Sequence, residues 1–400
     1  MTGMRLRLPH VIRIILICIP LLYYCYAPVI DAPPFDGDDV IHASRSRLLA
    51  DGNLHAWLRA LQFEEPSEVE LLYRPVIVPI FLADYLLSPG RMWGGRVINL
   101  TFHLANAVLL FMIARQMGLT SAAGTAGAIM YAVHPMLALN VSYVACTPYI
   151  TIVTQFCLCL YLMRSYFQTG SHLRLGVALG LFTLGVLELE TIVSMPIMLI
   201  AANEWLSPLP RERRRRRIPI YAVLFLLIVL HYAVVFLRIR AMDFPQAYAY
   251  ARVRMWDRLT DLHIGPLAFV ALPFKALLSP VSEVVVSSAA GTAIPWVSAG
   301  LLVVLMLAGR PYDGTRRRIV LFGIVWAAAT FLPTYPEIQG AQVDWGQSKY
   351  YYLPFSGLIL AIAALLPRRP ADRQGAAPML AAALAVLLLV PITRLHTMAL

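Results

Sequence analysis

The amino-acid sequence predicts an all-α, polytopic membrane protein of about 11 transmembrane helices. Hydrophobic residues make up 59% of its 400 residues and charged residues 14%, and the mean hydropathy is +0.68. A soluble domain is about half apolar and about a quarter charged, so lipid must cover the surplus apolar surface. Backbone groups in lipid must be satisfied within their own segment, which predicts helices. We therefore interpret residues 1–400 as a single membrane domain.

The predicted spans follow one another along the whole chain. They cover residues 11–30, 95–116, 121–139, 147–165, 173–188, 190–206, 218–239, 295–309, 319–335, 350–366 and 376–394. The first has a basic start but no small-residue cleavage site before Pro33, so we expect a retained span rather than a signal peptide. With a cytoplasmic N-terminus, every strong arginine cluster, including Arg211 to Arg217, falls on the cytoplasmic side.

Charge and cysteine content exclude two other classes of function. The net charge of +11 comes from arginines clustered between apolar runs, so we expect contact with membrane lipids and no nucleic-acid binding. The five cysteines are odd in number, lie within or beside spans and fit no zinc spacing. We interpret them as apolar filler and predict no metal site from them.

The apolar segment 264–280 breaks the alternation of sides. Counting it as a span would move the later arginine clusters to the wrong side of the membrane. We therefore expect a re-entrant or interfacial helix bounded by Pro266 and Pro280. Irregular backbone at membrane depth is tolerated where protein or a cavity covers it, so this segment is a candidate wall of a binding site.

The same orientation makes residues 31–93 the large first extracytoplasmic loop, with juxtamembrane helices expected within it. Ten of the 22 acidic residues fall in this loop. Asp38 and Asp39 precede a predicted helix over 39–50, where a carboxylate can cap the free backbone amides. A carboxylate fixed there beside the membrane is also a preorganised general base for an acceptor hydroxyl. The two roles are compatible.

Two further candidates lie at the outer ends of spans. His134, followed by Pro135, is either a hydrogen-bonded helix-end residue or a group that binds substrate. Glu190 follows Glu188 at the junction of two spans. Ionisable groups at that depth are usually paired or face a cavity, which favours a function, although a short solvated hairpin is the alternative.

Basic residues on the outer side suggest phosphate recognition. Arg252 and Arg254 belong to a group of outer arginines before the segment 264–280. They either contact lipid headgroups or form a phosphate-binding surface, because guanidinium groups match phosphate oxygens. Lys349 leads into Tyr350–Pro354, and it either reaches the interface or neutralises a lipid-linked phosphate. The tyrosines, including Tyr352, are first interpreted as an aromatic belt.

An ordered series of short motifs resembles a known family. Asp-Asp follows the first span, Tyr-Arg-Pro (with Arg74) precedes the second, His-Pro follows the third, and Glu-Thr-x-x-x-x-Pro and Tyr-Leu-Pro come later. The series is similar to the membrane part of the transmembrane and tetratricopeptide-repeat O-mannosyltransferases and their bacterial relatives. These are GT-C glycosyltransferases that use polyprenyl-phosphate-linked sugars. The resemblance covers roughly residues 10–366.

The resemblance implies that Asp38 or Asp39 is the catalytic base. It also implies substrate or phosphate contacts for Arg74, His134, Glu190, Lys349 and Tyr352. The chain departs from the family pattern at several positions, and the repeats are not found after the last span. The departures are Leu189 for a lysine, Ser348 and Lys349 for glutamate and arginine, and Thr147 and Tyr149 for an arginine and an acid.

From the resemblance we expect transfer of a sugar from a polyprenyl-phosphate-linked donor to an acceptor hydroxyl. The acceptor would be a protein or glycan, and the site would be periplasmic in a bacterial inner membrane. No cofactor is fixed by the sequence, and a divalent cation stays open. A transporter or flippase for lipid-linked intermediates, and an inactive relative that assists envelope glycan assembly, are the alternatives.

Overall fold

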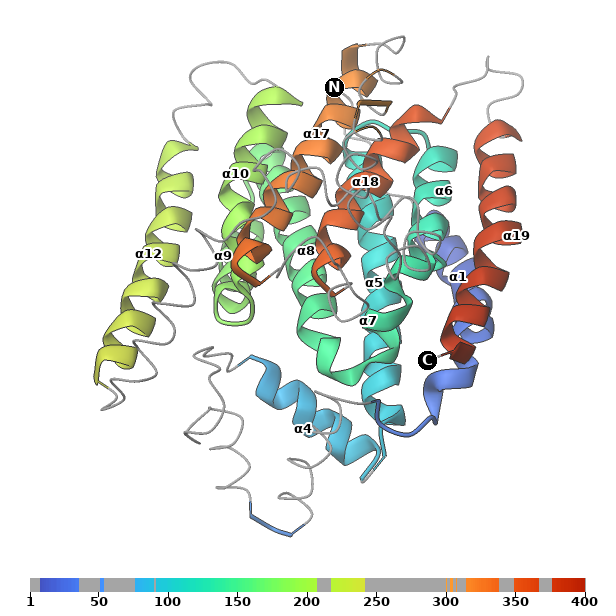
Figure 1. Ribbon diagram of the computed structural model, residues 1–400. Coiled ribbons are helices and arrows are strands. Elements are labelled where there is room, and N and C mark those ends of the chain that lie inside the picture. Colours follow the sequence, from blue (N-terminus) through green and yellow to red (C-terminus); the bar gives the residue numbers. More distant parts are fainter. Residues whose placement is uncertain are drawn as a thin grey trace.

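The computed structural model of the chain is a bundle of roughly parallel and antiparallel helices (Figure 1). It describes residues 8–35, 51–53, 76–89, 91–206, 217–241, 300, 303–304, 307, 314–337, 349–366 and 376–399. These residues form helices, turns and connecting segments, and none of them forms a strand, as the all-α prediction requires.

The helices follow the predicted spans closely. The α-helices are α1 (Leu8–Ile30), α4 (Ile77–Leu87), α5 (Trp93–Gln116), α6 (Ser121–Ala132), α7 (Ala138–Ser142), α8 (Thr147–Thr169), α9 (His172–Val186), α10 (Met195–Ile200), α12 (Ile218–Ala241), α17 (Gly314–Phe331), α18 (Tyr352–Leu365) and α19 (Ala376–Ala399). Short 3-10 or π segments are η1 (Pro135–Leu137), η2 (Val144–Cys146), η3 (Glu190–Ser194), η4 (Ala201–Trp205) and η7 (Leu332–Glu337). Most of the predicted span 295–309, and the whole segment 264–280, lie outside the described residues.

Several of these helices have the length and composition of membrane spans. Within the described part, 4 helical units are long and apolar enough to cross a membrane. They are α1, α5, η2 with α8, and α17 with the start of η7. If the bent unit of α6 with η1 and α7 is counted as one span, the number of candidate membrane spans rises from 4 to 5. The helices at the other predicted spans are shorter over their described apolar stretches, for example α9 with 15 residues. The chain therefore has the character of a multi-pass membrane protein.

Two of the predicted spans are interrupted rather than continuous. The axis bends by 50° between α6 and the η1–α7 unit, where Pro135 follows His134 and has no backbone N–H to donate. The predicted span 190–206 begins as the 3-10 turn η3, continues as α10 and ends in the π turn η4. Pro135 is the predicted end of regular helix in the first case. In the second, hydropathy does not distinguish α, 3-10 and π hydrogen bonding, so the sequence predicts an uninterrupted helix over 190–206.

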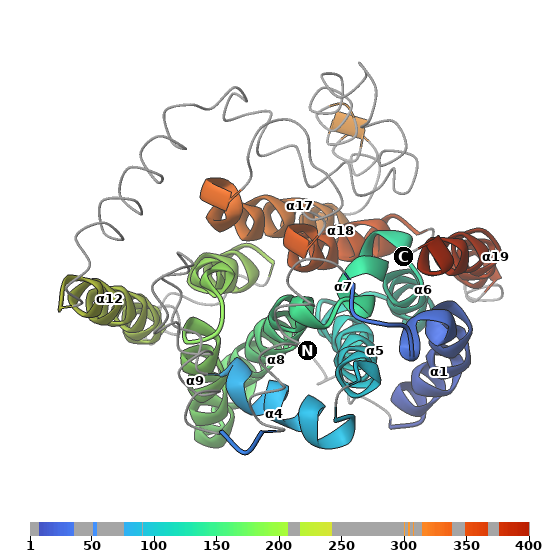
Figure 2. The same cartoon turned by 60° about the horizontal axis from the view of Figure 1, so that its bottom comes forward.

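Helix α5 lies near the centre of the bundle, as the end-on view in Figure 2 shows. It packs against α1, α4, α6, α7, α8 and α18. Helices α17 and α18 cross closely at Gly323 and Gly357. A Cβ atom at Gly357 would lie 2.6 Å from the Gly323 carbonyl oxygen and 2.7 Å from the Trp326 side chain. Glycine at this crossing lets the two backbones approach, as in other membrane helix pairs.

Helices α1 and α19 lie side by side at one edge of the bundle (Figure 2) and run in the same direction (Figure 1). The Thr397 hydroxyl donates to the Cys25 carbonyl over 2.6 Å, and the Thr393 hydroxyl reaches the Val133 carbonyl over 2.6 Å. The outward faces of α1, α12 and α19 expose large apolar side chains, such as Leu16 and Leu387. Such faces suit contact with lipid rather than water.

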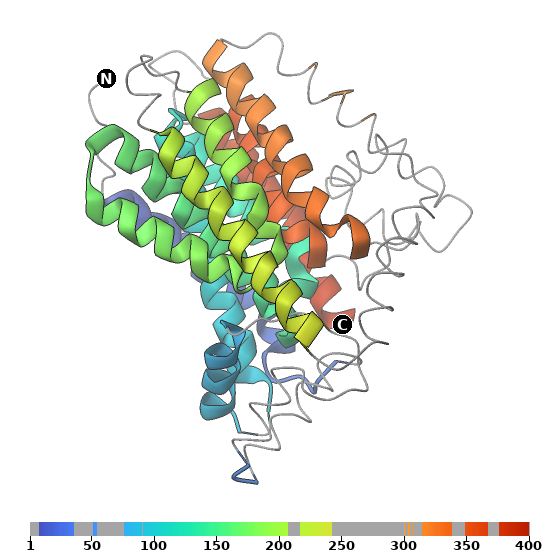
Figure 3. The ribbon, with the colours of Figure 1, turned by 90° about the vertical axis from the view of Figure 1, so that its left-hand side faces the viewer.

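Helix α4 projects beyond one end of the bundle (Figure 3). It lies within the predicted first extracytoplasmic loop and packs on α5. Its 11 residues are strongly apolar but too few for a span, which agrees with their place inside the predicted loop. We call the end of the bundle that carries α4 the α4 end.

Candidate functional site at the α4 end of helix α5

A stripe of polar side chains runs along the buried face of α5. Arg96, Asn99, His103 and Asn106 are spaced three and four residues apart, which places them on one helical face. Each of them is 0–1% exposed. Polar groups inside a membrane bundle are costly unless they are hydrogen-bonded, so their partners indicate what the stripe does. The sequence analysis did not identify this stripe, although the spacing is visible in the sequence.

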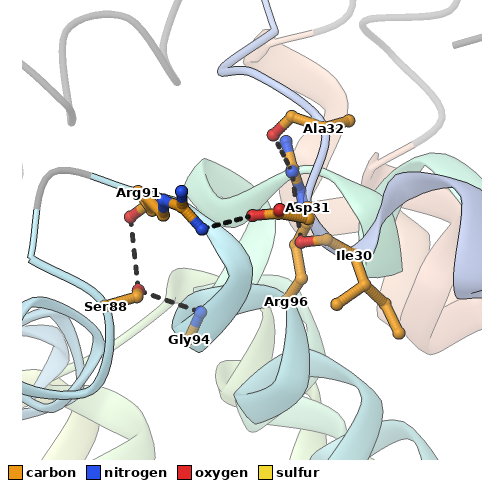
Figure 4. Close-up of polar contacts among 7 residues, drawn as sticks. All are labelled: Ile30, Asp31, Ala32, Ser88, Arg91, Gly94 and Arg96. Carbon is orange, nitrogen blue, oxygen red and sulfur yellow. Dashed lines mark hydrogen bonds and ion pairs between the residues drawn. The ribbon is translucent and has the colours of Figure 1, made fainter.

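Arg96 holds the chain that leaves α1. Its guanidinium donates to the Pro33 carbonyl over 2.8 Å and to the Ala32 carbonyl, and its Nε donates to the Ser142 carbonyl over 3.0 Å. Figure 4 shows the Arg96 side chain extending from α5 toward Ala32. The Phe35 ring lies 5.0 Å from the guanidinium, so the first residues after α1 are fixed against α5.

A second set of contacts ties the far end of the same loop to its start (Figure 4). The Arg91 guanidinium lies 3.6 Å from the Asp31 carboxylate. The Ser88 hydroxyl accepts from the Gly94 N–H over 2.9 Å and donates to the Arg91 carbonyl over 3.2 Å. A Cβ at Gly94 would lie 2.6 Å from that hydroxyl, so the α4–α5 corner needs a glycine there. The two ends of the first loop therefore meet at the α4 end.

Asn99 satisfies the backbone where the chain breaks between α7 and α8. Its Nδ2 donates to the Tyr143 carbonyl over 3.2 Å and to the Val141 carbonyl over 3.3 Å. Its Oδ1 accepts from the Thr147 hydroxyl over 2.7 Å. Carbonyls released at a helix end within a bundle need such partners. The segment from His134 to Thr147 is thus a broken stretch of short helical turns whose backbone is hydrogen-bonded by side chains of other segments. Protein-covered irregular backbone of this kind is what the sequence predicts for residues 264–280.

Lys349 lies beside this break. The Asn140 Nδ2 donates to the Lys349 carbonyl over 3.2 Å, which fixes the start of the segment leading into α18. The Lys349 ammonium lies 5.8 Å from the centre of the Tyr149 ring and 5.6 Å from that of Tyr350. Aromatic faces favour a cation at this distance. The Tyr149 and Tyr350 rings therefore hold the Lys349 ammonium beside the break.

Glu188, rather than Glu190, is the deeply buried acid at the junction of α9 and η3. Glu188 is fully buried and accepts from the Thr151 hydroxyl and the Gln155 amide of α8. Glu190 is the first residue of η3 and is partly exposed. Glu188 therefore does not belong to a solvated hairpin of two ordinary glutamates. Its hydrogen-bond donors lie on α8 in the three-dimensional structure and could not be read from the sequence around it.

Tyr352 and His134 occupy buried positions. The His103 Nε2 donates to the Ala132 carbonyl over 3.0 Å, so its Nδ1 accepts from the Tyr352 hydroxyl. The His134 Nδ1 accepts from the Met136 N–H over 3.2 Å and caps η1. Their contact with a substrate stays a prediction. Tyr350, Tyr351 and Tyr352 are all buried, so the prediction of an aromatic belt at this position is wrong.

The remaining predicted site residues cannot be placed. Asp38, Asp39, Arg74, Arg252 and Arg254 lie outside the described residues. Among the described residues, no three His, Cys, Asp or Glu side chains gather at one point that would hold a metal ion. All five cysteine side chains are buried, in agreement with their interpretation as apolar filler.

The described part of the α4 end can supply positive charge and hydrogen-bond donors. Lys349 carries the charge that can meet an anion there, because the Arg96 guanidinium is buried and donates to backbone carbonyls. Such a surface suits a phosphate or another anion. In comparisons with known proteins, no protein-family profile matches the chain and no curated protein sequence matches it.

Proposed function

We propose that the protein is a GT-C-type glycosyltransferase of the membrane. It would transfer a sugar from a polyprenyl-phosphate-linked donor to an acceptor hydroxyl at the α4 end, on the extracytoplasmic side. The observation that carries the proposal is the Arg96 anchor, which ties the start of the acid-rich first loop to the same end of the bundle as Lys349.

Chain length supports the position of the catalytic acids. Phe35 packs against Tyr143 with a ring-centre distance of 6.0 Å and against the Arg96 guanidinium. Asp38 follows Phe35 by three residues, which span at most about 11 Å when fully extended. The proposal therefore needs no more than this length of chain to bring Asp38 or Asp39 to the α4 end.

The reaction follows from the chemistry of these groups. Asp38 or Asp39 takes the proton of the acceptor hydroxyl, and the resulting oxygen attacks the anomeric carbon of the donor sugar. The bond between that carbon and the lipid phosphate oxygen breaks, and the sugar is transferred with inversion. The negative charge that remains on the polyprenyl phosphate is stabilised by Lys349, with Arg74, Arg252 or Arg254 as further contacts.

The parallel course of α1 and α19 supports the predicted topology of 11 spans. Two parallel helices at the start and end of a series require an odd number of crossings, and 11 has this parity. With a cytoplasmic N-terminus, as the arginine clusters indicate, the α4 end is extracytoplasmic. A bacterial inner membrane would place this end in the periplasm.

Carboxamide substitutions test the proposal in membranes that contain the protein. We would measure release of sugar from polyprenyl-phosphate mannose and polyprenyl-phosphate glucose for Asp38→Asn and Asp39→Asn. The true base should lose about 10²–10⁴-fold in turnover. Asp51→Asn is the matched control, because Asp51 is an exposed acid of the same loop. If both substitutions at 38 and 39 keep the wild-type rate, the mechanism is wrong.

A further inference from the structure

The end of the bundle opposite α4 contains buried arginines. Arg164 at the end of α8 is 2% exposed, and Arg217 before α12 is 3% exposed. The two guanidiniums are close enough to interact electrostatically. Buried like charges are stable only when counter-charge and hydrogen bonds compensate for them.

The compensation within the described residues comes mainly from Glu204. The Arg217 Nη1 lies 3.0 Å from the Glu204 carboxylate, which belongs to the π turn η4. The Arg164 Nη1 donates to the Ala202 carbonyl of the same turn. The turn η4 therefore contacts both arginines, through the Glu204 carboxylate and the Ala202 carbonyl. Single π turns inside helices are frequent at functional sites.

Two features show that Arg217 is available for a further acceptor. Its Nε is buried without a hydrogen-bond partner, although the guanidinium lies over the Phe167 ring at 4.6 Å. Its carbonyl accepts from the Tyr221 N–H over 3.1 Å, which makes Arg217 the N-cap residue of the 24-residue helix α12. A helix N-terminus carries partial positive charge, so a cation there is unfavourable without an anion.

The sequence directly before Arg217 is also rich in arginine. Arg211 and Arg213 to Arg216 directly precede Arg217, and Glu212 is the one acid among them. Glu204 is 19% exposed, so the cluster can be approached beside that carboxylate. A phosphate group has the charge and the oxygen geometry that paired guanidiniums and a helix N-terminus recognise.

We propose that Arg164, Arg217 and the N-terminus of α12 form a binding site for a phosphate group at the arginine-rich end of the bundle. The phosphate is supplied either by the headgroup of an anionic bilayer lipid or by a soluble phosphate. Basic pockets between membrane helices bind lipid headgroups in this way. The site lies at the end opposite the proposed transferase site and does not depend on it.

Binding to the full-length protein in dodecyl maltoside tests the proposal. Thermal melting is measured with phosphatidylglycerol, with phosphatidylcholine and with inorganic phosphate. Stabilisation by phosphatidylglycerol alone identifies a lipid headgroup, and equal stabilisation by inorganic phosphate identifies a soluble ligand. Arg217→Gln should weaken the binding by about tenfold, because one charge-assisted contact is lost.

Two further variants separate binding from folding. Glu204→Gln removes the competing carboxylate and should strengthen the binding, whereas a purely structural ion pair would give no gain. Arg318→Gln is the matched control, because Arg318 is an exposed arginine at the same end and the net charge changes equally. The proposal is overturned if neither phosphate source stabilises the wild-type protein, or if Arg217→Gln and Arg318→Gln bind alike. Should Arg217→Gln not fold, weaker or unchanged binding in Glu204→Gln overturns it.

Discussion

Replacing Arg96 with methionine removes the anchor between α5 and the first loop while keeping a long apolar side chain. The guanidinium donates to the carbonyls of Ala32, Pro33 and Ser142. A hydrogen bond from a charged group contributes about 1.5–3 kcal/mol, and removing one partner of a buried charged interaction costs about 3–5 kcal/mol. Because the three bonds share one side chain, we expect a total loss of about 3–5 kcal/mol rather than their sum.

The assay is thermal melting of the purified protein in detergent, followed by intrinsic fluorescence. A large domain loses about 2–4 °C in Tm for each kcal/mol of unfolding free energy that it loses, so Arg96→Met should lower Tm by at least about 6 °C. Arg91→Met is the matched control at the same corner. Its ion pair with Asp31 is 68% exposed on both sides, and such pairs contribute about 0–1 kcal/mol. Equal Tm values for the two variants would refute the assigned role of Arg96.

Two further predictions concern packing and the buried polar stripe. Gly357→Val should lower Tm strongly, because its side chain would collide with the Gly323 carbonyl, and overpacking costs about 1–3 kcal/mol or more. Gly176→Val, with nothing within 4 Å, is the control and should melt like the wild type. Tyr352→Phe and His103→Phe should each lower the free energy of unfolding. The double variant should lose less of it than the two single losses added together, because the two side chains share one hydrogen bond. If the two single losses of unfolding free energy add exactly in the double variant, the contact between His103 and Tyr352 is contradicted.

The sequence predicted the long helices well, because span prediction needs only apolar length. The predicted spans 11–30, 95–116 and 147–165 coincide with α1, α5 and α8. It predicted juxtamembrane helices in the first loop but none over 77–87, since an apolar run of 11 residues is too short for a span. Pro135 marked the end of regular helix correctly, with His134 as a hydrogen-bonded helix-end residue. The break within 190–206 was missed, because hydropathy does not report which carbonyl each backbone amide donates to.

The candidate site was less predictable than the fold. Lys349 could be found as the cation before α18, and the structure places its ammonium beside Tyr149 and Tyr350. Arg96 and Asn99 were missed because they lie inside an apolar run and their partners are carbonyls from other segments. A search for polar residues at helical spacing would have found them, but only the folded chain shows what they hold.

The most direct test of the transferase proposal is a cryo-EM map of the protein in lipid nanodiscs with a polyprenyl-phosphate sugar bound. The proposal predicts headgroup density at the α4 end, with the phosphate in contact with the Lys349 ammonium and the sugar facing Asp38 or Asp39. Density for the phosphate at the opposite end, beside Arg164 and Arg217, with none near Lys349, would contradict it.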